Sequence, residues 1–210
     1  DHKRELPSRD SSTGLVEYAP SAKVVINGLV YQSEGITLNW HAPSSKQDVS
    51  EIQNIRQVWL CEGCGSSMNM PLGVVVNECV DCGDRLSNYG HHNQLMHFSY
   101  LDPAGFAVDV FAKPHNDLTT QRFVPPERPL ISAVGEWQPL STAAWGFYRV
   151  SEKGRVFHYT SGSHKQGYAV CLSCGRAEEM TQQGQIPEAF AARHTRLRGS
   201  QGREHAICEG

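Results

Sequence analysis

The stretch WLCEGCGSSMNMPLGVVVNECVDCG (residues 59–83) contains two C-x-x-C pairs, each followed by a glycine. Cys61 and Cys64 form the first pair, and Cys79 and Cys82 form the second. Two residues between cysteines let both sulfurs turn toward one point about 2.3 Å away, the Zn–S distance of a tetrahedral site. This pattern is typical of a zinc ribbon, so we expect one structural zinc ion at these four cysteines.

A pair of disulfides and a redox-active C-x-x-C are the two other interpretations of these cysteines. Disulfides would need an oxidising compartment, and a redox C-x-x-C rarely comes twice at ribbon spacing. Six of the seven cysteines of the chain lie in C-x-x-C pairs. This distribution favours a reducing cytoplasm with bound metal, and we expect a cytoplasmic protein.

The composition limits the classes of protein that the chain can represent. Its 210 residues are enough for one large or two small domains. It starts at Asp1 and ends at Gly210, and we expect it to be a piece of a longer or processed protein. No apolar run approaches the length of about 20 residues that a membrane helix needs. The formal net charge of −3 does not favour nucleic-acid binding.

Short apolar runs separated by turn signals predict a mainly β fold of the α+β class, with antiparallel strands around an inserted zinc ribbon. Asn27-Gly28, between apolar runs at 22–26 and 29–31, predicts a β-hairpin. A second turn at 33–35 would lead into a third strand at 36–40. These elements together would make a β-meander.

Cys171 and Cys174 form a third C-x-x-C pair of the same form as the first two. Two more ligands would have to come from the C-terminal tail, where the candidates are His194, His205 and Cys208. We expect Cys171, Cys174, His194 and Cys208 to bind a second zinc ion, with His205 as the competitor of His194. A leftover cysteine without metal is the alternative for Cys208.

The other histidines offer weaker candidates for metal ligands. His194 would lie in the last turn of a short helix predicted over residues 186–194, where histidine is common without metal. His91, His92 and His97 have no acidic partner at helical spacing, and the ribbon is already complete. We expect these three to be ordinary loop histidines.

Three longer runs carry a resemblance to a known family: PAGFAVDVFAKPHND (103–117), FVPPERPLISAVGEWQPL (123–140) and GYAVCLSCGRA (167–177). Together with the late histidine and Cys-x-Gly, they resemble the zinc-binding "domain of unknown function" module at the C-terminal end of bacterial DEAD/DEAH-box superfamily-2 helicases. That family includes the helicases of Druantia- and DISARM-type anti-phage defence systems. The resemblance covers residues 100–210 well and 20–100 more loosely.

The residues and the resemblance together imply a domain order, and the resemblance implies a function. The polar residues 1–20 predict an extended lead-in or linker, and the short apolar runs predict a β-meander with the ribbon at 21–98. The resemblance implies a helicase-associated module at 99–210 that is truncated at its end. The function would be that of a non-catalytic accessory region of an ATP-dependent DNA helicase, with ATP bound only in the parent's motor domains. Its partners would be those motor domains, DNA and a defence-system subunit, with no membrane.

The sequence motifs of ATP-driven motors and of zinc deaminases are absent from the sequence. There is no G-x-x-x-x-G-K-[ST] and no Asp-Glu-x-His or Asp-Glu-x-Asp, so we expect no ATP hydrolysis by this chain. A zinc deaminase would need H-x-E and a later P-C-x-x-C, and neither occurs. Catalysis within this chain is therefore not expected.

Basic side chains separate two possible roles, guidance of DNA and docking of a protein partner without DNA contact. The run from Arg193 to Arg198 is the only dense basic patch, so its exposure would favour DNA. The candidate phosphate contacts are Arg85, Lys113, Arg122, Arg149, Arg155, Lys165, Arg176, Arg193, Arg196 and Arg198. The aromatic residues available for stacking on bases are Phe147, Tyr148, Phe157 and Tyr159.

Overall fold

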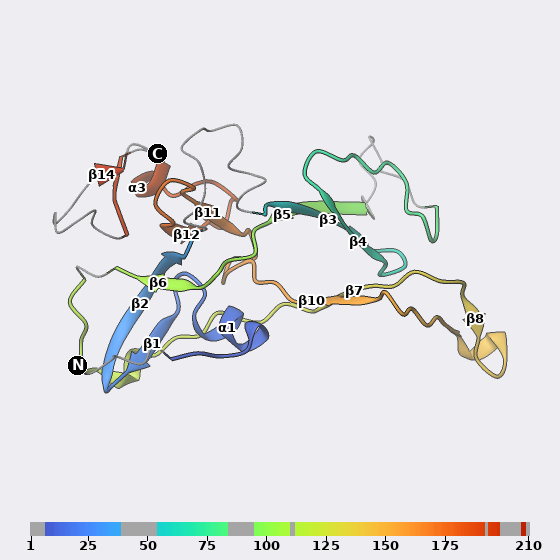
Figure 1. The fold of residues 1–210 in the computed structure, drawn as a ribbon, viewed down its shortest axis with the longest axis horizontal. Helices are drawn as coiled ribbons and strands as arrows, with labels where there is room; N and C mark the ends of the chain where they lie inside the picture. Colours follow the sequence, from blue (N-terminus) through green and yellow to red (C-terminus); the bar gives the residue numbers. More distant parts are fainter. Residues whose placement is uncertain are drawn as a thin grey trace. The chain divides into compact units, whose positions relative to one another are not determined.

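The computed structural model describes residues 7–38, 54–83, 95–109, 112–191, 193–197 and 207–208 (Figure 1). The chain divides into two compact units that are interleaved along the sequence. Unit 1 comprises Asp1–Gln53, Pro103–Glu127 and Tyr159–Gly210, and unit 2 comprises Asn54–Asp102 and Arg128–His158. The consecutive domains expected from the sequence, at 1–20, 21–98 and 99–210, remain a prediction.

Unit 1 is built from three small antiparallel sheets with the strand orders β1-β2-β6, β11-β12 and β13-β14. Its elements are α1 (Ser11–Glu17), β1 (Lys23–Ile26), β2 (Leu29–Ile36), β6 (Phe106–Val108), η1 (Leu118–Thr120), β11 (Tyr168–Val170), β12 (Ala177–Glu179), α3 (Glu188–Ala191), β13 (His194–Thr195) and β14 (Ile207–Cys208). The prediction of a mainly antiparallel β fold is confirmed. No helix among the described residues is long and apolar enough to cross a membrane.

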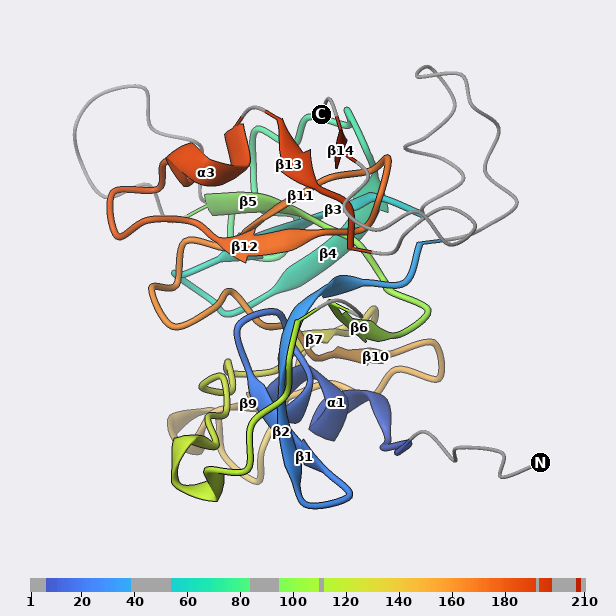
Figure 2. The same cartoon turned by 90° about the vertical axis from the view of Figure 1, so that its left-hand side faces the viewer.

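The hairpin predicted at Asn27-Gly28 is confirmed, and the meander is wrong. Asn27 and Gly28 have φ angles of 52° and 78°, as the turn of a tight hairpin needs, and they join β1 to β2. β2 then continues to Ile36, with a β-bulge between Ser33 and Gly35 instead of a turn. Its other neighbour is β6 from a distant part of the sequence (Figure 2).

The lead-in, expected to be extended, contains α1. Asp10 caps this helix, since its carboxylate accepts hydrogen bonds from the Thr13 backbone N–H at 3.0 Å and from the Ser12 hydroxyl at 2.6 Å. The Val124 N–H donates to the Val16 carbonyl at 3.0 Å and so attaches α1 to the rest of the unit. The local capping signal was present in the sequence, and the polar composition of the segment obscured it.

Unit 2 contains a three-stranded sheet of order β4-β3-β5 and one long β-hairpin. The sheet is formed by β3 (Arg56–Cys61), β4 (Ser67–Pro71) and β5 (Leu95–Tyr100). The hairpin is formed by β7 (Leu130–Ser132), β8 (Gln138–Pro139), η2 (Ala143–Trp145), β9 (Phe147–Tyr148) and β10 (Arg155–Phe157). β7 pairs with β10 at the base, and β8 pairs with β9 toward the apex (Figure 1).

The base of this hairpin packs on the sheet of unit 2 through one face. Leu130 is buried, and the Phe157 ring meets Tyr100 of β5 edge-on with a centroid distance of 4.5 Å. The Ser67 hydroxyl also donates to the Ile131 carbonyl at 2.9 Å. On the opposite face the paired side chains of Ile131 and Val156 are exposed.

The close approach of β2 to the third C-x-x-C segment depends on Gly35. The Ile36 N–H donates to the Gly175 carbonyl at 2.8 Å. A Cβ atom on Gly35 would meet that carbonyl oxygen and would lie 2.7 Å from a methyl carbon of Leu197. Only glycine therefore fits at this position.

We expect Gly35→Ala to lower the free energy of unfolding by about 2 to 3 kcal/mol, because the added methyl group forces backbone apart. Urea unfolding followed by circular dichroism measures the change. Gly105→Ala is the matched control, since its Cβ would lie 3.6 Å from the Thr37 hydroxyl, an ordinary contact. Equal unfolding midpoints for the two variants would contradict this account.

Candidate metal centres

The three C-x-x-C-G segments adopt the same local conformation. In each, the glycine N–H donates to the carbonyl of the first cysteine: Gly65 to Cys61 at 2.8 Å, Gly83 to Cys79 at 2.9 Å, and Gly175 to Cys171 at 2.8 Å. The three glycines have φ angles of 74°, 77° and 82°, in the left-handed region that a β-carbon disfavours. This closed loop turns both sulfurs of a pair toward one point.

Cys61, Cys64, Cys79 and Cys82 come together in unit 2, and we call this cluster the four-cysteine site. Their sulfur atoms all lie within 4.8 Å of one another. The Cys61–Cys82 distance is 3.5 Å and the Cys64–Cys79 distance is 3.7 Å. A tetrahedron with Zn–S bonds of about 2.3 Å has edges of about 3.8 Å, so these separations fit a metal ion.

A second cluster, which we call the C-terminal site, contains Cys171, Cys174, His194 and Cys208 of unit 1. The Cys171 and Cys208 sulfurs are 3.7 Å apart, and Cys174 Sγ lies 3.3 Å from His194 Nε2. These distances also fit one tetrahedral ion. The four expected residues are therefore brought together, while the competitor His205 lies outside the described residues.

The expected position of His194 in a helix is wrong. α3 ends at Ala191, and His194 begins β13, where it lies directly opposite Cys208 of β14. This strand pairing brings the two late residues to the third C-x-x-C pair. The Phe190 ring stacks on the His194 imidazole with a centroid distance of 5.2 Å and thereby restricts the orientation of the ring.

The geometry excludes disulfides for these cysteines. All seven are free thiols, and the measured sulfur–sulfur distances are well beyond the bond length of about 2.05 Å. Contact with Cys174 lowers the pKa of the Cys171 thiol to about 4, and the same contact raises the pKa of Cys174. The crowded thiols therefore cannot all ionise by themselves, whereas a bound cation would stabilise every thiolate.

The two sites differ in their access to solvent. At the C-terminal site Cys171, His194 and Cys208 are buried, with Phe190 and Ala169 in the same apolar cluster. At the four-cysteine site Cys61 and Cys79 are buried beside Trp59, but Cys64 and Cys82 are exposed. Each site thus forms part of a small core, and only the four-cysteine site has two ligands open to solvent.

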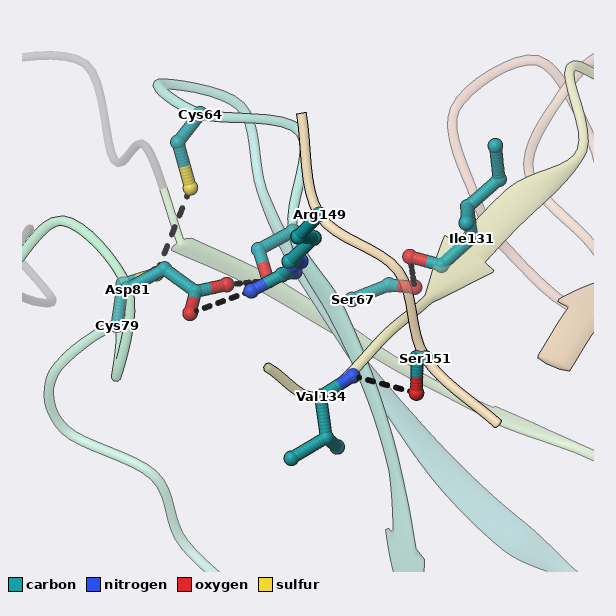
Figure 3. A network of polar contacts seen from close by, with 9 residues as sticks. Cys64, Ser67, Cys79, Asp81, Ile131, Val134, Arg149 and Ser151 are labelled. Atoms are coloured by element: carbon teal, nitrogen blue, oxygen red, sulfur yellow. Dashed lines mark hydrogen bonds and ion pairs between the residues drawn. The ribbon is translucent and has the colours of Figure 1, made fainter. Parts of the chain in front are cut away.

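Arg149 of the hairpin binds both loops of the four-cysteine site (Figure 3). Its Nη1 lies 2.9 Å from Asp81 Oδ1, and its Nη2 donates to the Ser66 hydroxyl at 3.4 Å. The Ser66 hydroxyl in turn donates to Asp81. The hydrogen bond from Arg149 is the main cause of the lowered pKa of the Asp81 carboxyl group.

Arg176 performs a similar role beside the C-terminal site. Its Nη1 lies 2.5 Å from a Glu34 oxygen of β2, and its Nη2 lies 2.8 Å from an Asp109 oxygen. Its Nε donates to the Thr195 carbonyl at 2.6 Å. Because the side chain is largely buried and fully engaged, Arg176 is unsuited to the phosphate contact proposed from the sequence.

The remaining basic candidates are not gathered into one described patch. Lys165 and Arg193 are exposed, and Lys165 lies in a turn with a φ angle of 57°. Arg196 is half-buried, and its buried Nε has no hydrogen-bond partner among the described residues. Arg85 and Arg198 lie outside the described residues.

The aromatic and histidine candidates fall into different environments. Phe147 and Tyr148 are exposed on the hairpin, whereas Phe157 and Tyr159 are half-buried. The expected place of His97 in a loop is wrong, because it lies in β5 opposite Trp59. Its ring stacks on Trp59 with a centroid distance of 4.7 Å, and it belongs to no metal cluster of the described residues. His91 and His92 lie outside the described residues.

Sequence reasoning did not assign Asp81, Arg149, Glu34 or Asp109 to the attachment of the metal loops to their units. It placed Arg149 among the candidate phosphate contacts, for which this buried, ion-paired side chain is unsuited. Asp81 had a usable signal, since a carboxylate between two expected ligands is available to orient its loop. Its partner Arg149 is 68 residues away and had no such signal.

Comparisons with protein-family models, with curated proteins and with solved structures found no match. Function has to be inferred from the two clusters and their surroundings.

We expect the purified chain to contain two metal ions, and we expect Cys61→Ser and Cys208→Ser each to lose one. Removal of one of four ligands leaves a site that binds metal far more weakly. Inductively coupled plasma mass spectrometry measures the content. Ser173→Ala, at an exposed position between two expected ligands, is the control and should retain both ions. An unchanged content in Cys208→Ser would contradict the C-terminal site.

We expect the four-cysteine site to release its ion to a chelator at least about tenfold faster than the C-terminal site, because Cys64 and Cys82 are exposed. The two single-site proteins separate the rates: Cys208→Ser retains the four-cysteine site, and Cys61→Ser retains the C-terminal site. Release is followed with a colorimetric metal indicator. If Cys61→Ser, which retains only the C-terminal site, released its ion faster than Cys208→Ser, solvent access of the ligands would not explain the release rates.

Proposed function

We propose that the chain is a zinc-stapled, non-catalytic accessory region of an ATP-dependent DNA helicase or translocase of bacterial anti-phage defence. In this role it guides nucleic acid or docks a partner subunit. The observation that carries the proposal is the pair of closed clusters, one of four cysteines and one of three cysteines with a histidine, which are donor sets of structural zinc sites. A structural zinc ion contributes on the order of 10 kcal/mol of free energy that is coupled to folding.

The closed donor sets support a structural role for both ions. Catalytic zinc sites commonly have three protein ligands and leave the fourth position open for water or substrate. Here four protein ligands converge at each site. The sequence also lacks the G-x-x-x-x-G-K-[ST], Asp-Glu-x-His and Asp-Glu-x-Asp motifs of an ATP-driven motor. Any ATP hydrolysis would therefore belong to motor domains outside this sequence.

Two of the three runs that resemble the helicase-associated module, 103–117 and 167–177, are connected in space within unit 1, whereas the third, 123–140, lies mostly in unit 2. The run 167–177 forms the third C-x-x-C-G loop and supplies Arg176, while the run 103–117 supplies its partner Asp109. Residues that are far apart in sequence thus belong to one structural arrangement around the C-terminal site. This connection supports an origin of these two runs in one module.

DNA guidance would use the exposed cations of unit 1. Lys165 and Arg193 are exposed, and phosphate contacts from lysine and arginine supply most of the affinity of non-specific DNA binding. The net charge of −3 means that such contacts would have to be local. A small cationic face is compatible with guiding a strand that the motor already holds.

A protein-docking role without DNA contact is the second candidate function, and the apex of the hairpin favours it. The twelve residues from Trp137 to Tyr148 include no charged side chain. Trp145 is 75% exposed and Phe147 is 57% exposed. Exposed aromatic residues are enriched where one protein binds another, and an uncharged apex gains nothing from phosphate neutralisation.

We expect the double variant Lys165→Glu/Arg193→Glu to bind single-stranded DNA about tenfold more weakly than the wild type, with a salt slope reduced by about 2. Fluorescence anisotropy of a labelled oligonucleotide, measured at several salt concentrations, gives both quantities. Arg128→Glu/Lys153→Glu makes the same charge change at exposed positions of unit 2 and is the matched control. Equal weakening by both variants, or no DNA binding by the zinc-loaded wild type, would reject guidance by this face and favour protein docking.

A further inference from the structure

The contacts of Arg149 connect three parts of unit 2 that are separate in sequence. Its guanidinium binds Asp81 and Ser66, as described above, and also lies over the Trp137 ring at 4.5 Å from the centroid. Only 8% of the Arg149 side chain is exposed. An arginine that is buried, ion-paired and stacked on an aromatic face has one well-defined position.

The partners of Arg149 on the sheet side belong to the metal loops. Ser66 follows the Cys64-Gly65 end of the first loop, and Asp81 lies between the second pair of cysteines. A metal ion would hold the two loops together through all four sulfurs and would thereby set the position of Ser66 against Asp81. Without a cation no bond joins the two loops through their sulfurs, so the two-part acceptor for Arg149 would be lost.

The hairpin has few other polar contacts beyond its base. Among its described residues between 133 and 155, the hydrogen bonds other than those of Arg149 lie within the hairpin. Val134 N–H donates to the Ser151 hydroxyl at 3.1 Å, and the Tyr148 hydroxyl donates to the Gln138 side chain at 2.9 Å. Among the described residues, the contact of Arg149 is therefore the polar attachment of the distal hairpin to the rest of unit 2 (Figure 3).

We propose that Arg149 is a positioning residue that couples metal occupancy of the four-cysteine site to the packing of the aromatic hairpin. With metal bound, Arg149 holds the strand that carries Phe147 and Tyr148 against the metal loops. Loss of the metal releases the hairpin. Coupling of two equilibria is reciprocal, so the same contact also retains the metal. The inference rests on the proposed zinc occupancy of this site.

The experiment is hydrogen exchange of the zinc-loaded protein, read by mass spectrometry for peptides from residues 130–157, together with the rate of zinc release to a chelator. In Arg149→Met we expect hairpin amides to exchange at least about fivefold faster and the four-cysteine site to release zinc about tenfold faster. Peptides of unit 1 and release from the C-terminal site should be unchanged. Chelation should then accelerate exchange of the hairpin in the wild type but not in Arg149→Met.

Two further variants make the result decisive. Arg155→Met removes an exposed arginine from the same hairpin and should behave like the wild type. Arg149→Lys retains the charge but loses the planar fork that reaches Asp81 and Ser66 while stacking on Trp137, so we expect an intermediate effect. If Arg149→Met retains less zinc than Arg155→Met before any chelator is added, the reciprocal half of the coupling is already observed.

Arg149→Met and Arg155→Met with the same exchange and the same release rate would overturn the inference. Wild-type metal analysis separates this failure from that of the proposed function. A wild type without zinc at the four-cysteine site refutes the zinc-stapled role itself. A loaded wild type whose hairpin is indifferent to Arg149 refutes only the coupling.

Discussion

The convergence of four metal-binding side chains at each of two points is the constraint on which the rest of this structure depends. Sulfur atoms 3.5 to 3.7 Å apart are too close to be several anions without a cation, and too far apart to be disulfides. The sheets around them have two or three strands, and a two-stranded sheet is marginally stable by itself. The clusters therefore have to supply much of the cohesion that a larger apolar core would otherwise provide.

Each cluster is joined to its unit by a buried arginine of its own. Arg176 binds Glu34 and Asp109 beside the C-terminal site, and Arg149 binds Asp81 beside the four-cysteine site. Desolvation makes such ion pairs weak contributors to stability, but a buried arginine that loses its partner is strongly unfavourable. These contacts therefore specify where the metal loops sit against the neighbouring strands, which a metal ion alone does not determine.

The sequence was sufficient for local features and insufficient for long-range ones. The three C-x-x-C-G loops and the Asn27-Gly28 turn were predictable, because each is closed by hydrogen bonds or backbone angles within a few residues. The expected ligand His194 joined its cluster, but through strand pairing with Cys208 and not from a helix. The contact of Arg176 with Glu34 spans 142 residues, and no local pattern encodes a partner at that distance.

The hairpin of unit 2 has an anchored part and an apex that is free to contact other molecules. Leu130 and Phe157 attach the base of the hairpin by apolar packing, and Arg149 attaches its middle by charge. At the apex, most of the Trp145 side chain is in contact with solvent, where burial would be more favourable by on the order of 2 kcal/mol. An apolar side chain that is kept exposed on an arm fixed at two points contributes little to the fold and is available for the protein docking proposed above. The loops of the four-cysteine site hold that arm through the contact between Arg149 and Asp81, so the proposed docking and the proposed metal site would depend on each other.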